Sequence, residues 1–195
     1  MTAKPPPIPP HPFRFTREQY YELTAAGFFD NVPVELIFGR VFEMAPDGET
    51  QTASRRKVIE ELQRSFGSAA RVGRATSVCL PDSAPRPDAT VLASALENDV
   101  ANLTSALLVV EVADATLSYD LTTKAELYAT ANVPEYWVLD LEHRQLIVFR
   151  DPQSLPLPPD LAATAYRTRL TFLPTDRVSP LAAPSASILV SDLLP

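Results

Sequence analysis

The chain has 195 residues, a length that suits one domain of ordinary size with a substantial core. Its hydrophobic share of 46% and charged share of 21% are those expected of a soluble globular protein. A net charge of −7 and an isoelectric point near 4.8 argue against a protein that coats nucleic acid through a uniformly basic surface.

The same composition indicates the cellular compartment. A single cysteine, Cys79, excludes an internal disulfide framework and a cysteine-based zinc site, and we expect it to be a small core residue. No apolar stretch approaches the roughly 20 residues that a membrane span needs, and MTAKPPPIPPHP lacks the apolar region of a signal peptide. We therefore expect a cytoplasmic protein.

Proline and capping residues organise the N-terminal part of the chain. Residues 1–12 are predicted to form a proline-rich arm, because proline lacks the backbone donor that helices and central strands use. Residues 13–195 are predicted to form a single domain. Thr16 and Gln19 match a capping box, which predicts a helix that runs to Ala26.

The remaining elements follow from periodicity. VELIFG and RVFEMA indicate an N-terminal β-hairpin around Gly39, and a helix is predicted from about 52 to 66. Further strands are expected at 70–80 and 88–92. The segments LLVVEVA, EYWVLDLE and QLIVFRD are predicted strands, and so is YRTRLTFL near the C-terminus. A helix is expected over about 119–131. Because this helix would connect two strands as a crossover, the predicted class is α/β (α+β) with one central mixed sheet.

Glu111 is the first candidate site residue, because it interrupts the apolar run LLVVEVA. A buried carboxylate is costly unless it is protonated, paired with a cation or bound to a metal. A simple structural ion pair remains one explanation. The next helix favours a site, because Lys124 falls at about 140° on a helical projection, between Leu127 near 80° and Tyr128 near 180°.

Two further carboxylates accompany this pair. Asp88 directly precedes an apolar strand, although a turn residue would explain it equally well. Glu35 lies in VELIFG, where strand alternation leaves open which face it occupies. Three carboxylates converging near one lysine would make an oxygen site suited to Mg²⁺ or Mn²⁺. Such an ion can polarise a phosphodiester and activate water, while a lysine stabilises the developing charge.

These segments resemble a known family. RPDATVL, LLVVEVADATLSYDLTTKAELYATANVPEYWVLDLE and the C-terminal TDRVSPLAAPSASILVSDLLP are similar to the Uma2 family (DUF820), a branch of the PD-(D/E)XK nuclease superfamily. The opening hairpin VELIFGRVFEMAP also matches, so the resemblance covers residues 13–195. It implies a restriction-endonuclease-like core, in which helices flank a central mixed sheet.

The resemblance also implies roles for individual residues. Asp88 and Glu111 match the acidic pair that binds Mg²⁺ or Mn²⁺, and Glu35 matches an acidic hairpin residue that binds metal directly or through water. The superfamily's lysine commonly lies two residues after the second acid, but here it matches Lys124 on the following helix. Asp120 matches an aspartate one helical turn earlier, which we expect to orient Lys124 as an i,i+4 pair.

The chain departs from the family pattern at two places. Many relatives carry a histidine where this chain has ETQTAS, and an acidic residue where it has Arg40. The leading hypothesis is a metal-dependent endonuclease acting on DNA, with a homodimer suited to symmetric cleavage. The alternative is a nuclease fold without turnover that binds nucleic acid or has a regulatory role. A third possibility, a sugar hydrolase with paired carboxylates, has no obvious use for Lys124.

Overall fold

The computed structural model describes residues 12–74, 80–93, 106–154 and 164–195. The predicted proline-rich arm, except for its last residue, lies outside these residues, and so does Cys79. In the part of the chain that the structure describes, no helix combines the length and the apolar composition needed to cross a membrane.

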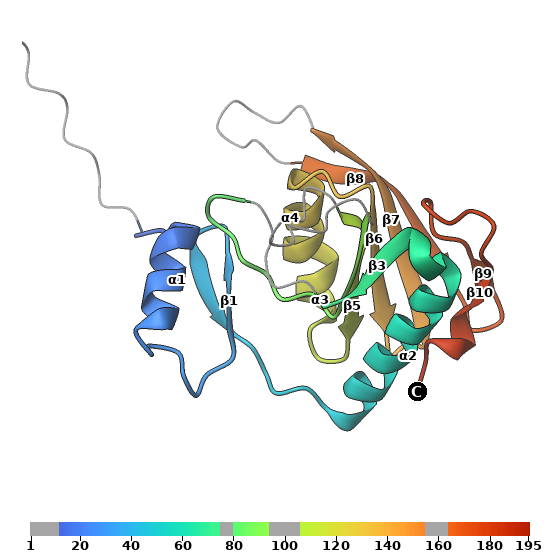
Figure 1. Cartoon of the computed structure of the whole chain (residues 1–195), viewed down its shortest axis with the longest axis horizontal. Coiled ribbons are helices and arrows are strands. Elements are labelled where there is room, and N and C mark those ends of the chain that lie inside the picture. The colour runs from blue at the N-terminus through green and yellow to red at the C-terminus, as the bar shows by residue number, and fades with distance from the viewer. Residues whose placement is uncertain (1–11, 75–79, 94–105, 155–163) are drawn as a thin grey trace, which may run out of the picture.

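A six-stranded mixed sheet forms the centre of the molecule (Figure 1), with the strand order β3-β4-β5-β6-β7-β8. Its strands are β3 (Ala70–Gly73), β4 (Ala89–Ala93), β5 (Ala106–Ala113), β6 (Glu135–Asp140), β7 (Gln145–Ser154) and β8 (Thr164–Phe172). All neighbouring strands are antiparallel except β5 and β6, which are parallel. The predicted crossover and mixed sheet are therefore confirmed.

One face of the sheet is covered by α2 (Glu49–Phe66) and the C-terminal segment. This segment contains β9 (Arg177–Val178), β10 (Ile188–Leu189) and a short 3₁₀ helix (Val190–Asp192), and another 3₁₀ turn (Gly67–Ala69) follows α2. Val58, Leu62 and Phe66 recur at helical spacing along α2 and pack against the strands. Burial of this apolar stripe holds the helix on the sheet.

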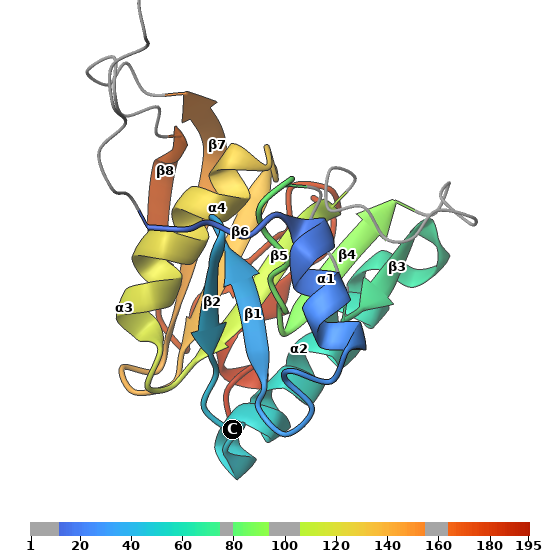
Figure 2. The same cartoon turned by 90° about the vertical axis from the view of Figure 1, so that its left-hand side faces the viewer.

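The other face is covered by the crossover helix, which has three parts: α3 (Leu117–Tyr119), a π-helical turn (Asp120–Lys124) and α4 (Ala125–Thr130). An N-terminal unit lies beside it (Figures 1 and 2). This unit contains α1 (Arg17–Ala25) and a hairpin of β1 (Val34–Ile37) and β2 (Arg40–Glu43). The crossover segment therefore lies close to both the hairpin and the sheet.

Local sequence explains the N-terminal unit. Thr16 and Gln19 form both hydrogen bonds of the predicted capping box at the start of α1. The hairpin turns through Phe38 and Gly39, both with positive φ. A side chain at Gly39 would place its Cβ 2.6 Å from the Cβ of Arg14, so the close approach of the N-terminal segment requires glycine there. The predicted hairpin is confirmed.

Alternation along β5 determines where Glu111 points. Leu108, Val110 and Val112 join the core on the α2 side, and Val109 and Ala113 join the core on the α4 side. Since successive side chains of a strand point to opposite faces, Glu111 points toward the crossover helix and the hairpin. Apart from half-buried Leu107, every residue of the strand is buried, so both of its faces are covered.

Candidate active site

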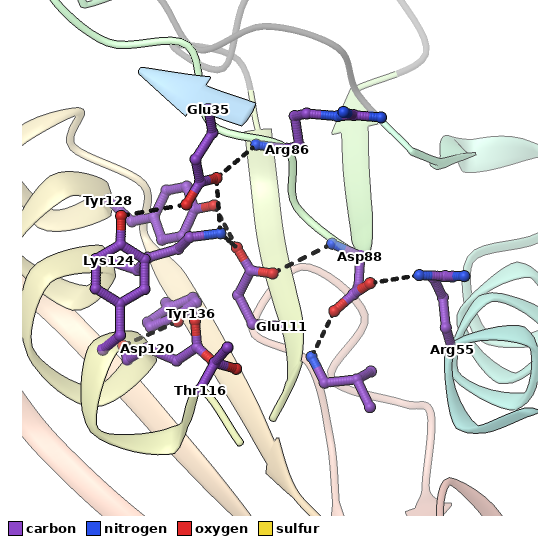
Figure 3. Close-up of polar contacts among 12 residues, drawn as sticks. Glu35, Arg55, Arg86, Asp88, Glu111, Thr116, Asp120, Lys124, Tyr128 and Tyr136 are labelled. Carbon is purple, nitrogen blue, oxygen red and sulfur yellow. Dashed lines mark hydrogen bonds and ion pairs between the residues drawn. The ribbon is translucent and has the colours of Figure 1, made fainter. Parts of the chain in front are cut away.

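Glu111 and Lys124 meet on the α4 side of the sheet (Figure 3). The Nζ atom of Lys124 lies 2.9 Å from Oε1 of Glu111, and the two residues are 1% and 4% exposed. Tyr128, one turn further along the helix, donates its hydroxyl proton to the same oxygen over 2.7 Å. The structure thus brings together the strand glutamate and the helix lysine that the sequence places on facing surfaces.

Glu35 completes the environment of the lysine. Its Oε2 atom lies 3.0 Å from Nζ of Lys124 and accepts a hydrogen bond from the backbone N–H of Arg86 over 3.2 Å. Its Oε1 atom accepts a hydrogen bond from the hydroxyl of Tyr119 over 3.2 Å. The orientation that the sequence left open follows from packing, because Val34 and Leu36 turn toward α1 and leave Glu35 facing the sheet.

Asp88 lies at the start of β4, next to the end of β5. Its Oδ2 atom accepts the backbone N–H of Val112 over 2.8 Å, and its Oδ1 atom accepts a hydrogen bond from Arg55 over 2.9 Å. Arg55 also contacts Asp47. The backbone N–H of Asp88 donates to Oε2 of Glu111 over 3.4 Å, so this turn residue is attached directly to the Glu111 site.

Asp120 is buried nearby but does not form the predicted i,i+4 contact. Its carboxylate accepts a hydrogen bond from the hydroxyl of Thr116 over 2.6 Å, and its backbone carbonyl accepts one from the hydroxyl of Tyr136 over 3.0 Å. Among the described residues, Lys124 forms ion pairs with Glu35 and Glu111 only. The π-helical turn begins at Asp120 and ends at Lys124, and both residues are buried.

Burial and neighbouring charges perturb the ionisation of this group. Burial raises the pKa of Glu111 to about 8, although the ammonium of Lys124 opposes the shift. Burial likewise raises the pKa of Asp120 to about 6, again opposed by Lys124. For Lys124, burial disfavours the charged form, but the carboxylates of Glu111, Glu35 and Asp120 outweigh burial and raise its pKa. Lys124 is therefore a stable cation, and Glu111 and Asp120 hold their protons more tightly than usual.

A cavity of about 300 Å³ opens onto this group. Its acidic lining residues are Asp47, Asp88, Glu111, Asp114 and Asp120. Its basic lining residues are Arg74, Arg86 and Lys124. Glu35 does not line the cavity, because its carboxylate is fully buried against Lys124. Of the predicted residues, Asp88, Glu111, Asp120 and Lys124 therefore line one accessible cavity. Glu35 contacts Lys124 but does not line the cavity.

The oxygen atoms at the cavity suit a hard divalent cation in kind. Asp88 and Glu111 supply neighbouring carboxylates, and Mg²⁺ is commonly held by one or two carboxylates together with water and substrate phosphate. The three carboxylates expected to converge do not form a cage. Within the described ranges, no three His, Cys, Asp or Glu side chains are grouped so that they could hold a metal ion. The donor set therefore fits an ion with two protein carboxylates rather than three.

Three contacting residues were not predicted from the sequence. Tyr128 belongs to the apolar helix face, and its spacing of four from Lys124 is the signal that could have revealed its hydroxyl. Tyr119 is near the start of the same helix and gives no comparable signal. Arg55 is 33 positions from Asp88, and nothing in the local sequence of α2 indicates which carboxylate it meets.

Comparisons with known proteins agree with the fold. The family model Uma2, described as "Putative restriction endonuclease", matches residues 17–182. A crystal structure described as "a putative nuclease belonging to DUF820" from Anabaena variabilis is similar at a TM-score of 0.71 and 16% identity. The similarity covers 92% of this chain and 97% of that one. No curated protein matches the chain in sequence. Since the family model spans most of its length, the chain belongs to the Uma2 family of restriction-endonuclease-like proteins.

Proposed function

We propose that this protein is an endonuclease that hydrolyses DNA phosphodiester bonds with Mg²⁺ or Mn²⁺ held by Asp88 and Glu111. The observation that carries the proposal is the buried lysine, paired with Glu111 at 2.9 Å in a cavity that Asp88 also lines. A structural ion pair has no need of a cavity. The family description and the nuclease fold support the same reaction class.

The protein's own residues have distinct parts in this reaction. The Lys124 ammonium, held between Glu111 and Glu35, is placed to donate a hydrogen bond to a phosphate oxygen and to stabilise negative charge in the transition state. Tyr128 and the backbone N–H of Asp88 hold the Glu111 carboxylate in place. A divalent cation, when bound, would polarise the phosphodiester and lower the pKa of the attacking water.

The charge balance of the site supports a cation. Of four buried carboxyl groups, those of Glu35, Asp88, Glu111 and Asp120, three form ion pairs with described residues, and the cations in these pairs are Lys124 and Arg55. Burial raises the pKa of Glu111, and the neighbouring carboxylates of Asp120, Asp88 and Glu35 add to this shift, while Lys124 opposes it. A divalent cation would compensate the excess negative charge.

Two roles assigned by resemblance stay predictions. Glu35 is a predicted metal ligand, but its contacts with Lys124, Tyr119 and the backbone of Arg86 favour positioning of the lysine. Asp120 is predicted to support Lys124 through its charge rather than through a direct hydrogen bond. A homodimer remains the arrangement that symmetric cleavage of duplex DNA would require.

Supercoiled plasmid and single-stranded circular DNA, incubated with Mg²⁺ or Mn²⁺, test the proposal. We expect the wild type to cut at least one substrate and Lys124→Met to lose cutting. Arg167→Gln, on the far strand β8, is the control that also removes one positive charge. Equal cutting by Lys124→Met, or no cutting by the wild type with either ion, would contradict the assignment.

A second candidate function, nucleic-acid binding without turnover, has one observation in its favour. The carboxylate of Asp88 is already bonded to Arg55 and to the backbone of Val112, and Glu111 is bonded to Lys124 and Tyr128. A site satisfied in this way can be purely structural. Calorimetric titration with Mn²⁺ distinguishes the two functions, because a binding module need not retain a metal site.

A further inference from the structure

A second cavity of about 400 Å³ lies next to the active-site cavity. Arg74 and Arg86 line both cavities, so the two cavities are neighbours separated by these arginines. The second cavity is bordered on its other side by Tyr20, Tyr21 and Thr24 of α1. The buried carboxylates, the two arginines and the aromatic side chains of α1 therefore line two adjacent cavities, which together are called the binding path.

The two cavities differ in charge. Five acidic residues line the active-site cavity, but none of the residues lining the second cavity is acidic. Arg74 and Arg86 are both exposed, and within the described part of the chain neither forms an ion pair. Figure 3 shows the Arg86 side chain pointing away from Glu35, although its backbone N–H donates to that carboxylate. The second cavity is therefore a local cationic surface on an acidic protein.

Aromatic side chains accompany these charges. Tyr21 is 41% exposed, and its ring lies 5.6 Å, centroid to centroid, from that of Tyr20. Tyr20 is buried and donates its hydroxyl proton to the backbone carbonyl of Val34, which fixes its position. Tyr21 thus exposes a ring surface next to Tyr20, whose position is fixed by its hydrogen bond. Exposed aromatic rings next to cationic side chains are the usual means of holding unpaired bases and their phosphates.

From these observations we infer that the second cavity binds a short single-stranded DNA segment flanking the phosphodiester that enters the active site. Arg74 and Arg86 contact its phosphates, and the ring of Tyr21 stacks on an unpaired base. The inference rests on the proposed nuclease function. The net charge of −7 restricts the contact to a few nucleotides, because the rest of an acidic surface repels a longer strand.

Binding without cleavage tests the inference. Fluorescence anisotropy with a labelled 12-nucleotide oligo(dT) in EDTA measures Kd for the wild type and for Arg74→Gln, Arg86→Gln, Tyr21→Ala and Tyr21→Phe. We expect each arginine variant to weaken binding about five- to tenfold and to reduce the salt slope by about 0.7. Tyr21→Ala should weaken binding about tenfold, and Tyr21→Phe should retain it. Arg167→Gln, the matched charge control on β8, should bind as the wild type does.

The outcomes separate this inference from the proposed function. A wild type that cuts DNA with Mn²⁺, while Arg74→Gln and Arg86→Gln bind oligo(dT) normally, would overturn the binding path alone. Binding that depends on the arginines in a protein that never cuts would keep the path and contradict the nuclease. A wild type that does not bind oligo(dT), or that binds a 12-base-pair duplex more tightly, would overturn single-strand recognition.

Discussion

Glu111 and Glu135 are both buried glutamates in the central sheet, but they lie on opposite faces and in different surroundings. Glu135, at the start of β6, is fully buried and is bonded through Oε1 to Arg150 at 2.7 and 2.9 Å and to the indole N–H of Trp137. Its Oε2 atom accepts the backbone N–H of Leu181 over 2.7 Å. It fastens the C-terminal segment to the sheet and is absent from the lining of the active-site cavity.

Glu111 is bonded less completely. Its Oε1 atom has two close partners, but its Oε2 atom has only the 3.4 Å contact with the backbone of Asp88 among the described residues, and the residue lines a cavity. The comparison teaches that burial of a carboxylate alone does not identify a site. A buried carboxylate away from the cavity with both oxygens satisfied, as in Glu135, is structural, whereas Glu111 has an underbonded oxygen at a cavity, where it can receive a ligand.

The largest expected effect is on cleavage by Glu111→Gln. This substitution keeps the shape of the side chain and removes the charge that holds the cation, so we expect cleavage with Mg²⁺ or Mn²⁺ to fall below detection. The thermal midpoint should not decrease at pH 8. The variant no longer buries the Glu111 carboxylate, which is costly, and Lys124 keeps its ion pair with Glu35. Plasmid nicking and thermal unfolding provide the measurements. An active Glu111→Gln variant would show that Glu111, like Glu135, has a structural role only.

Lys124→Met should reduce cleavage about 10²- to 10³-fold, the loss typical when a preorganised donor to a transition state is removed. It also leaves Glu35 and Glu111 buried without their cation, at a cost of about 3–5 kcal/mol in unfolding free energy. The loss of stability should be greater at pH 8 than at pH 5, because Glu111 is protonated at pH 5. Urea unfolding at both pH values measures it, and an equal loss at both would contradict the coupling.

Glu135→Gln provides the opposite half of the comparison. Since it disrupts a buried ion pair with Arg150, we expect a decrease of about 3 kcal/mol in unfolding free energy. Cleavage per folded molecule should remain unchanged. Urea unfolding and plasmid nicking at a temperature below the transition separate the two effects, and lost cleavage in a folded variant would show that the two faces of the sheet are coupled.

The sequence predicted the features that depend on local patterns. The apolar run around Glu111, the turn at Gly39 and the crossover between β5 and β6 are local patterns, and they predicted the hairpin and the mixed sheet. Helical projection placed Lys124 inward even though its turn is π-helical. The orientation of Glu35 and the contact of Arg55 with Asp88 depend on packing between distant segments, which periodicity does not encode.

The pH dependence follows from the raised pKa of Glu111. Between about 4.5 and 8, the folded protein holds a proton that the unfolded chain has released, so this group's contribution to stability is complete below 4.5 and is lost as the pH rises toward 8. Metal binding requires the carboxylate, so affinity for Mn²⁺ should rise up to about tenfold per pH unit and level off above pH 8. Calorimetry in buffers with different ionisation enthalpies should detect proton release on binding. A pH-independent affinity would contradict the raised pKa.

The smallest expected effect belongs to Tyr128→Phe, which removes the hydroxyl that donates to Glu111. One hydrogen bond contributes about 1 kcal/mol to stability, or somewhat more when its acceptor is charged. We expect a similar loss in unfolding free energy and a decrease in cleavage of only a few fold, because Lys124 still holds the carboxylate. A complete loss of cleavage in a folded Tyr128→Phe variant would give the hydroxyl a direct part in the reaction.

Calorimetric titration of Mn²⁺ into the wild type, Glu111→Gln and Glu135→Gln tests the central claim most directly. We predict that the wild type and Glu135→Gln bind the ion at the same site with similar affinity, and that Glu111→Gln does not bind it. Equal binding by Glu111→Gln, or no binding by the wild type, would contradict the assignment of Glu111 as the metal-binding carboxylate of the two.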